Sequence, residues 1–389
     1  MREIGVDPYG IDIMLPKAAW HLVRTGPISS IAANILKQEM LSLGGDVAVS
    51  RETLTGKVKK TDCLAMANLS QYRRLCEKLE KQPFGLDNAA RELAATIANY
   101  QKDEFRLRLG RYALSMKRGR AYVMGIINLT PDSFSGDGLY KGRVSYSSAS
   151  CGIVEAAQRM ADDGADIIDI GGESSRPGAR PVTLREELKR TIPAIKRIAK
   201  KVNVPVSIDT YKPEVARQAL DSGAVMVNDI SGLSTAMAKV VSGYKAGVVI
   251  MHMKGRPRHM QRNPVYGSLI DEIIQYLSAA IKRGEASGVD RKKIIIDPGI
   301  GFGKRFEHNL EILRGLKEFK VLGRPIMVGP SRKSFLGEIL NAAAQERVFG
   351  TVSACVLAVK NGANIVRVHD VRAVKDAVKV LNSVNSITR

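Results

Sequence analysis

The chain has 389 residues and a formal net charge of +21, with the 44% hydrophobic content of an ordinary globular protein. It has no apolar run near the ~20 residues of a membrane span, and residues 1–7 lack the apolar stretch of a secretory signal. The four cysteines form no CxxC pair, which indicates a reduced, cytoplasmic protein. No arginine-rich block indicates nucleic-acid binding, and the excess charge suits either an anionic substrate or a solvated surface.

The first 118 residues differ in pattern from the rest and predict a small α/β domain. Helical periodicity and capping residues predict helices over 29–43, 69–81 and 86–102, with strands over 46–50 and 64–67. No chemical motif occurs in this part, so residues 1–118 are an extension without an assigned role. The polar stretch Lys117 to Arg120 is the predicted boundary, and a second domain is expected over residues 119–389.

After the boundary, strand-like and helix-like segments alternate along the chain. The expected strands cover residues 121–128, 165–170, 204–209, 225–229, 247–252, 293–297, 325–329 and 364–368. Helical periodicity lies between them, for example over 153–163, 184–200, 213–222 and 266–287. Eight such repeats over about 270 residues predict a (β/α)8 TIM barrel. A doubly wound open sheet is the alternative, but it gathers its ligand groups at one switch point.

Polar side chains follow several of these apolar strands at the point where each strand ends. The clearest case is Asp297, which leads into a loop with three glycines and Lys304. Glycine lets a backbone approach a ligand closely, although a plain turn after a strand gives the same pattern. Asp209, Asn228 and Arg367 occupy similar strand ends. A set of decorated strand ends indicates the catalytic face of a barrel.

Taken together, these motifs resemble those of the dihydropteroate synthases, the folate-pathway branch of the pterin-binding barrel family. The motifs that carry the resemblance occur in the family's order at residues 124–135, 169–178, 207–210, 227–231, 251–253, 297–304, 331–334 and 367–369. The resemblance implies that p-aminobenzoate displaces diphosphate from 6-hydroxymethyl-7,8-dihydropterin diphosphate, giving 7,8-dihydropteroate. It also implies a Mg²⁺ cofactor and a homodimer.

By this resemblance, one group of residues reads the pterin and the leaving group. The pterin-binding positions match Asp209, Asn228, Met251, Asp297 and Lys333. Carboxylates suit the ring's N–H donors, and an ammonium suits its carbonyl.

The catalytic set implied is Asp209, Lys333, Arg367 and His369, and Asn128 matches the metal-associated asparagine. Arg367 and His369 stand two residues apart on one strand, so both face the same side, where they would bind diphosphate.

A second group would surround p-aminobenzoate: Ser175, Arg176, Pro177, Phe302 and Ser334. This sequence has Ser175 where the family usually has threonine, which keeps the hydroxyl. The loop from Gly136 to Tyr140 carries one additional glycine, and Pro330 replaces a smaller or apolar residue.

Local roles remain open for some of these residues. Asp209, Ser334 and Asp370 each stand where a helix cap is expected, and a lone His369 would be an ordinary strand residue.

Two other functions remain open at this level. A methyltetrahydrofolate methyltransferase shares the barrel and the pterin slot, but it has no diphosphate to bind. The Arg367 and His369 pair and the stretch 331–334 therefore argue against it. A pterin-binding protein without catalysis, with residues 1–118 as its working part, is the other alternative, and the intact motifs argue against it.

Overall fold

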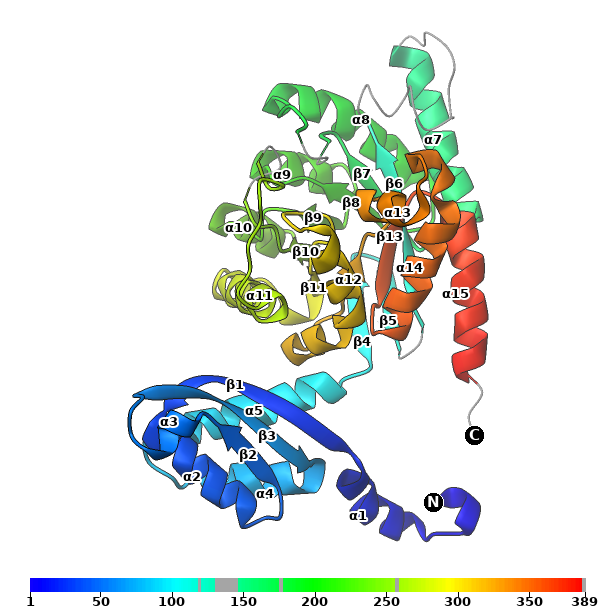
Figure 1. The fold of residues 1–389 in the computed structure, drawn as a ribbon. Helices are drawn as coiled ribbons and strands as arrows, with labels where there is room; N and C mark the ends of the chain where they lie inside the picture. The colour runs from blue at the N-terminus through cyan, green and yellow to red at the C-terminus, as the bar shows by residue number, and fades with distance from the viewer. Residues whose placement is uncertain (118–119, 130–145, 175–177, 256–258, 387–389) are drawn as a thin grey trace. The chain divides into compact units, whose positions relative to one another are not determined.

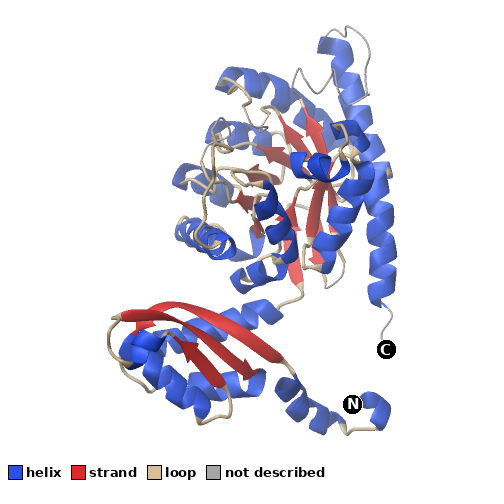
Figure 2. Cartoon of the chain, in the orientation of Figure 1, coloured by secondary structure: helices blue, strands red, loops and turns tan. Residues whose placement is uncertain are grey.

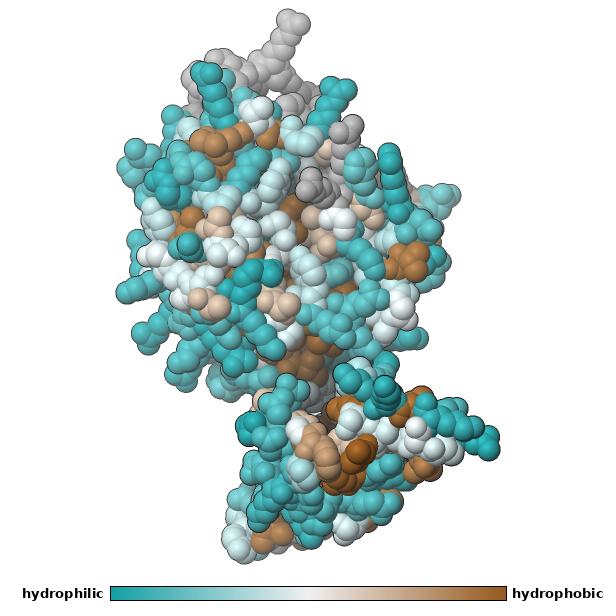
Figure 3. Space-filling view, turned by 90° about the vertical axis from the view of Figure 1, so that its left-hand side faces the viewer, coloured by the Kyte–Doolittle hydropathy of each residue, from teal (hydrophilic) through white to brown (hydrophobic). Residues whose placement is uncertain are grey.

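The computed structural model describes residues 1–117, 120–129, 146–174, 178–255 and 259–386. The chain divides into two compact units, Met1–Asn99 and Tyr100–Arg389. Within the described residues, no helix is long and apolar enough to cross a lipid bilayer. The visible face of the second unit is mostly hydrophilic with small apolar patches (Figure 3), as expected for a strongly charged chain.

The first unit is a three-stranded antiparallel sheet with the order β1-β3-β2, and helices pack on it (Figure 1). Its elements are η1 (Arg2–Ile4), α1 (Pro8–Ala18), β1 (Trp20–Ser29), α2 (Ser30–Leu41), β2 (Asp46–Val49), α3 (Arg51–Leu54), β3 (Lys60–Asn68), α4 (Leu69–Leu79) and α5 (Leu86–Gln101). Asn68 and Gln71 cap α4 reciprocally, which fixes the turn from β3 into that helix. The predicted α/β character is confirmed, but β1 and α1 were not predicted.

The second unit begins with a hairpin, β4 (Phe105–Leu109) and β5 (Tyr112–Met116). Eight parallel strands follow in the order β11-β10-β9-β8-β7-β6-β13-β12. They are β6 (Tyr122–Asn128), β7 (Ile167–Gly171), β8 (Val206–Asp209), β9 (Met226–Asp229), β10 (Gly247–Met251), β11 (Ile294–Asp297), β12 (Met327–Val328) and β13 (Ile365–Val368). A parallel bridge between Ile296 and Ile326 joins the two end strands, so the sheet closes and the predicted TIM barrel is confirmed.

Helices surround the closed sheet, with the strands gathered at its centre (Figure 2). They are α7 (Tyr146–Asp162), α8 (Leu184–Lys201), α9 (Pro213–Asp221), α10 (Thr235–Gly243), α11 (Leu269–Ala286), α12 (Phe306–Arg314), α13 (Ser334–Leu340), α14 (Val348–Lys360) and α15 (Val371–Ser386). Short 3-10 turns η2 (Arg291–Lys293), η3 (Leu316–Leu322) and η4 (Ala344–Glu346) complete the chain. The doubly wound alternative is therefore wrong.

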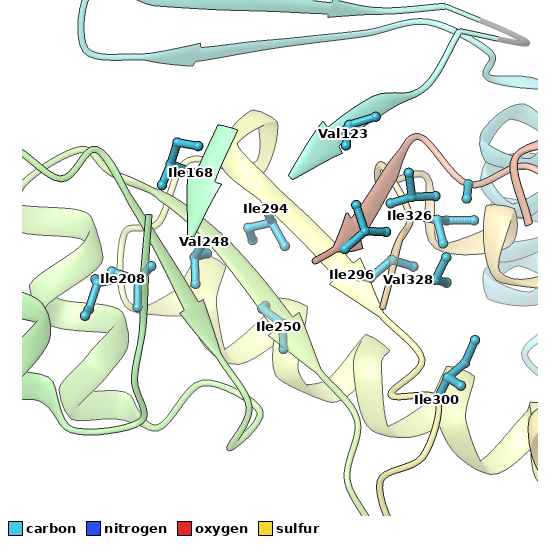
Figure 4. Packing of buried hydrophobic residues seen from close by; sticks show 14 of the residues in the cluster. Val123, Ile168, Ile208, Val248, Ile250, Ile294, Ile296, Ile300, Ile326 and Val328 are labelled. Carbon is cyan, nitrogen blue, oxygen red and sulfur yellow. The ribbon is translucent and has the colours of Figure 1, made fainter. Parts of the chain in front are cut away.

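Alternate residues of each strand face two different cores. Side chains such as Val123, Ile168, Ile208, Val248 and Ile294 face outward and pack under the helices (Figure 4). Their neighbours in sequence face the interior of the barrel because successive side chains of a strand point to opposite faces. This period of two decides which residues at each strand end can meet inside the barrel.

The interior has an apolar floor to which the hairpin contributes. Leu107, Leu109, Leu114 and Met116 cluster with strand residues that lie low in the barrel. The strand residues of this cluster are Tyr122, Met124, Ile167, Met226, Val249, Ile295, Met327 and Ile365.

The hairpin therefore belongs to the barrel. The structure divides the chain after Asn99, earlier than the boundary predicted after residue 118.

Candidate active site

A polar layer lies directly above the apolar floor. The interior-facing residues two positions beyond the floor residues of their strands are Asp169, Asn228, Met251, Asp297 and Arg367. Asp209, two positions beyond interior-facing Ser207 on β8, extends this layer at the carboxyl ends of the strands. Six strands thus place predicted or newly recognised site residues in one layer of the barrel.

Arg367 stands in the middle of this layer with two carboxylate partners. Its Nε donates to Asp169 Oδ2 at 2.6 Å, and its Nη2 donates to Asp209 Oδ2 at 2.8 Å. Burial lowers the pKa of Arg367, but the adjacent Asp169 and Asp209 outweigh that effect and raise it, so the guanidinium stays charged. Asp209 is therefore not a helix cap, and the N-cap of α9 is Lys212.

Burial raises the pKa of the Asp209 carboxyl to about 7, although Arg367 acts in the opposite direction. The carboxylates of Asp169, Glu187 and Asp229 add to the increase. A carboxyl that titrates near neutrality can hold or release a proton at the working pH of the protein, which is a common property of functional sites.

Asn228 is another predicted pterin residue in the layer. It is buried, and its Nδ2 donates to Asp169 Oδ2 at 3.1 Å. Met251 is also buried, beside Asp297 in the parallel register of β10 and β11. The structure therefore brings Asp209, Asn228, Met251 and Asp297 together around the barrel interior.

Asp297 is held by the glycine-rich loop that follows it. Its Oδ1 accepts a hydrogen bond from Gly299 N at 2.7 Å. Gly299, Gly301 and Gly303 have φ values of 72°, 80° and 60°, in the left-handed region that favours glycine. A Cβ at Gly299 would lie 1.9 Å from the His252 carbonyl oxygen, so this loop is built for close approach.

The glycine loop also contacts Lys333 on the next strand-to-helix connection. Lys333 Nζ donates to the Ile300 carbonyl and lies 4.5 Å from the centre of the Phe302 ring. Burial lowers the pKa of Lys333 to about 8, with Asp297 opposing the decrease. Burial also raises the pKa of Asp297, and Lys333 opposes that increase. Asp297 and Lys333 are the acid and the ammonium that the sequence analysis expected at the pterin edge, and in the structure each stabilises the charged form of the other.

Beneath this loop lies a buried contact between Lys304 and His252. Lys304 Nζ meets His252 Nδ1 at 3.0 Å and donates to the carbonyls of Gly299 and Phe302 at 3.0 and 2.9 Å. Burial lowers the pKa of Lys304 to about 7 and that of His252 to about 3. His252 is therefore neutral, and Lys304 fastens the loop that carries Phe302.

His369 lies just after β13, as the residue spacing predicted. Its Nδ1 is 3.1 Å from Ser331 Oγ, and its backbone N–H donates to the same oxygen at 3.2 Å. Next to it, Asp370 accepts hydrogen bonds from Arg332 Nε at 3.1 Å and Nη2 at 2.7 Å. These contacts tie the loop after β12 to the loop after β13.

Ser334 is the first residue of α13 and is exposed, and Lys333 rather than Ser334 occupies the N-cap position.

The part of the chain that contains these residues is similar to known proteins. Residues 124–369 match the family described as pterin binding enzyme. The dihydropteroate synthase of Synechocystis is 49% identical over 267 residues, which are 68% of this chain and 90% of that protein. The chain belongs to the pterin-binding enzyme family. Within it, this chain is a dihydropteroate synthase, a transferase of folate synthesis.

Solved structures of the same enzyme show the same barrel. The Xanthomonas albilineans dihydropteroate synthase with 4-aminobenzoic acid is 39% identical, with a TM-score of 0.66 over 73% of this chain and all of that one. The Yersinia pestis enzyme with a sulfonamide drug has a TM-score of 0.67 over 72% of this chain.

A relative from Halobacterium salinarum, described as a probable bifunctional folylpolyglutamate synthase and dihydropteroate synthase, is 38% identical over 381 residues. That match reaches into the first unit, and it spans 98% of this chain but only 45% of the relative.

Asn128 is the residue that the family resemblance assigns to magnesium. It ends β6, faces the interior and is partly exposed. A Cβ at Gly171 would lie 3.5 Å from Asn128 Oδ1 and 3.8 Å from Asp209 Oδ2, so glycine keeps the space between these two oxygens open. Mg²⁺ is held by few protein oxygens together with substrate phosphates and water, and the amide oxygen of Asn128 fits such a site.

Sequence reasoning missed several residues beside the site. Asp169 was read only as the start of a motif, and Lys212 was not considered. Lys212 Nζ joins Glu173 and Glu187 at 2.5 Å each, and Tyr211 donates to Glu173 at 3.1 Å.

These contacts border a small, partly open hollow lined by Glu173, Ser174, Glu187, Asp209, Thr210, Tyr211 and Ile230. The predicted residues Ser175, Arg176 and Pro177, and the loop from Gly136 to Tyr140, lie outside the described residues.

Proposed function

We propose that the enzyme joins 6-hydroxymethyl-7,8-dihydropterin diphosphate to p-aminobenzoate at the carboxyl ends of its barrel strands. The amine nitrogen forms a bond to the pterin methylene carbon, the bond from that carbon to the diphosphate oxygen breaks, and the amine loses one proton. The observation that carries this proposal is the polar layer in which the buried Asn228 and Asp297 lie with the partly exposed Asp209 and Lys333. That layer supplies acceptors for an N–H-rich ring edge and an ammonium for its carbonyl.

The pterin ring is held by this layer in our proposal. Asp297 and Asp209 accept from the ring's N–H groups, the Oδ1 of Asn228 accepts a further hydrogen bond, and Lys333 donates to the carbonyl. Met251 forms an apolar wall. A carboxylate beside the ring also stabilises positive charge that develops when the diphosphate leaves before the amine arrives.

In our proposal, the diphosphate binds to Arg367, His369 and a metal ion at Asn128. Arg367 has five N–H groups, and two of its nitrogens are committed to Asp169 and Asp209. Its remaining donors can hold the leaving group together with His369. A Mg²⁺ ion at Asn128 would neutralise charge on the departing diphosphate.

The p-aminobenzoate pocket is assigned to Phe302, Ser334 and the loop residues Ser175, Arg176 and Pro177. The exposed hydroxyl of Ser334 suits a carboxylate, and the Phe302 ring suits the aryl group. We expect p-aminobenzoate to bind only after diphosphate or the pterin diphosphate is in place, since the first ligand would complete the second pocket.

The methyltransferase alternative is set aside because the relatives that cover the barrel are dihydropteroate synthases. A catalytically inactive barrel is tested directly by diphosphate release from the two substrates with Mg²⁺. We expect release that requires both substrates and that falls sharply in Asp297→Asn. Release without p-aminobenzoate, or none with both substrates, would contradict the proposal.

We also propose that the enzyme is a cytoplasmic homodimer. Buried free thiols at Cys63, Cys76 and Cys355 suit a reducing compartment. Exposed apolar side chains on adjacent helices suit a partner copy, and they are Phe349 and Leu357 on α14 with Val380 and Val384 on α15.

Sedimentation measurements test the dimer. Phe349→Glu should shift it toward monomer, whereas Phe84→Glu, an equally apolar exposed position in the first unit, should not. A monomeric wild type would refute the dimer.

A further inference from the structure

Asp169 on β7 belongs to the polar layer and is fully buried. A single oxygen, Oδ2, accepts hydrogen bonds from Arg367 Nε at 2.6 Å and from Asn228 Nδ2 at 3.1 Å. Arg367 comes from β13 and Asn228 from β9, and each of these strands is two places away from β7 in the sheet, on opposite sides. One carboxylate oxygen therefore joins two ligand-binding side chains across the barrel.

The contact with Asn228 fixes the orientation of that amide. A carboxylate oxygen has no hydrogen to donate, so the Asn228 atom that faces it must be the nitrogen, and Oδ1 faces the other way. A pterin presents mainly N–H donors along its edge. The orientation set by Asp169 is thus the one in which Asn228 can accept a hydrogen bond from the ring, and a flipped amide would place donor against donor.

The contact with Arg367 fixes the plane of the guanidinium. Asp169 engages Nε, and Asp209 engages Nη2 at 2.8 Å, so two carboxylates hold adjacent edges of the planar group. The other donors then point in a set direction. Without Asp169, the guanidinium could rotate about its contact with Asp209 and present different donors to a phosphate.

We propose that Asp169 is a positioning residue of the enzyme, which sets the amide of Asn228 for the pterin and the guanidinium of Arg367 for the diphosphate. It acts through these two side chains and contacts no substrate atom. The inference deepens the proposed function, because it rests on the roles assigned there to Asn228 and Arg367.

Asp169 accepts both hydrogen bonds through one oxygen, so its role as an acceptor can be tested separately from its negative charge. Among the described residues, Oδ1 has no hydrogen-bond partner and is buried. Asn at position 169 can place its amide oxygen at the Oδ2 position and accept from both donors. Asp169→Asn therefore keeps the positioning contacts, whereas Asp169→Ala removes them.

The first experiment compares these variants in the full chain by calorimetry with two ligands, 6-hydroxymethylpterin and its diphosphate with Mg²⁺. We expect Asp169→Ala to bind both ligands at least about tenfold more weakly, since a lost hydrogen bond to a charged group costs at least ~1.4 kcal/mol. Asp169→Asn should stay within about threefold of wild type, because hydrogen bonds to a neutral oxygen are only moderately weaker.

Ser207→Ala is the matched control. Ser207 is buried on β8 and pairs with Asp169 in register, and its Oγ has no hydrogen-bond partner within the described ranges. It should bind both ligands like wild type. Equal losses in Asp169→Ala and Asp169→Asn, or equal losses in Asp169→Ala and Ser207→Ala, would overturn the proposal.

A second experiment exchanges the two side chains and remains decisive if Asp169→Ala does not fold. Asn228→Asp places two carboxylates face to face and should lose pterin affinity. The double variant Asp169→Asn with Asn228→Asp restores a donor and an acceptor in reversed order at this contact, so affinity for 6-hydroxymethylpterin should recover. The amide nitrogen at position 169 then faces the Arg367 Nε–H donor, so affinity for the pterin diphosphate should not recover. A double variant that binds 6-hydroxymethylpterin as weakly as Asn228→Asp would refute the positioning role.

Different results would contradict the proposed function and the role of Asp169. A wild-type chain that releases no diphosphate from the two substrates contradicts the proposed function itself. A wild-type chain that releases diphosphate, with variants that show neither rescue, contradicts only the role of Asp169.

Discussion

Because the β4–β5 hairpin packs against the barrel floor, a truncated chain should fold only if it begins before this hairpin. A chain that begins at Lys117 lacks β4 and β5, whereas a chain that begins at Tyr100 keeps them together with the ion pair from Lys320 to Asp103 at 2.7 Å. We expect the longer version to fold as a barrel. We expect the shorter one to unfold or aggregate, because the apolar floor of its barrel would face water.

The size of the effect follows from four side chains. Leu107, Leu109, Leu114 and Met116 have exposed fractions of 1%, 0%, 8% and 0%. Burying such a side chain contributes about 1.5–3 kcal/mol, so the hairpin side chains together contribute about 6–12 kcal/mol. The whole stability of a domain is typically about 5–15 kcal/mol. The loss is therefore comparable with the entire margin, before the floor residues newly exposed on the strands are counted.

The assay is urea unfolding followed by circular dichroism on both shortened chains, with diphosphate release as the functional measurement. The chain from Tyr100 should show one cooperative transition and retain activity. The chain from Lys117 should show neither. If both chains unfolded with the same midpoint, the hairpin would not be part of the barrel core and the boundary after residue 118 would stand.

Three further changes test the site. Asp297→Asn is isosteric and should weaken pterin binding in calorimetry by about 1.5–3 kcal/mol through loss of a charge-assisted hydrogen bond, and an unchanged affinity would reject the role of the acid. Arg367→Lys should weaken binding of the pterin diphosphate but barely change that of the pterin alone, because lysine lacks the planar fork. Equal losses would assign Arg367 to the slot. In the folded state Lys304 has a pKa of about 7, below the ~10.4 of an unfolded lysine, so the unfolded chain binds more protons between these values. The free energy of unfolding of wild type should therefore rise with pH in this window relative to Lys304→Met, by up to about 1.4 kcal/mol per pH unit, and parallel curves would refute the assignment.

The barrel could be predicted because its strands have strong local signals. Ile294, Ile295 and Ile296 form the continuous apolar run of a strand that is buried on both faces. The hairpin was missed although Leu107 and Leu109 alternate with arginines, a pattern that indicates a strand with one buried face. In β1, Gly26 and Pro27 interrupt the alternation where the register with β3 also shifts, so the strand had a weak signal.

The sequence could predict those site residues whose type and position at a strand end indicate a function. It could not predict residues whose role depends on contacts with distant parts of the chain. Asp209, Asn228, Asp297 and Arg367 lie at or next to the ends of apolar strands, and in the structure they lie in one layer. Asp169 sits within an apolar run and reads as part of a strand. Its partners are 59 and 198 residues away in the chain, so nothing near it in sequence announces the contacts.

Few backbone contacts close the barrel between β11 and β12. The two strands share a single bridge, from Ile296 to Ile326, in which Ile296 N donates to the Pro325 carbonyl at 2.9 Å. The N–H of Ile326 is instead bonded to Asn364 Oδ1 at 2.9 Å, on the side of β13. Asp297 ends β11, and Lys333 lies in the chain just beyond β12. We expect the free energy of local opening to be lowest between β11 and β12, where opening would change the distance between Asp297 and Lys333. Amide hydrogen exchange should therefore be faster in β11 and β12 than in the other barrel strands.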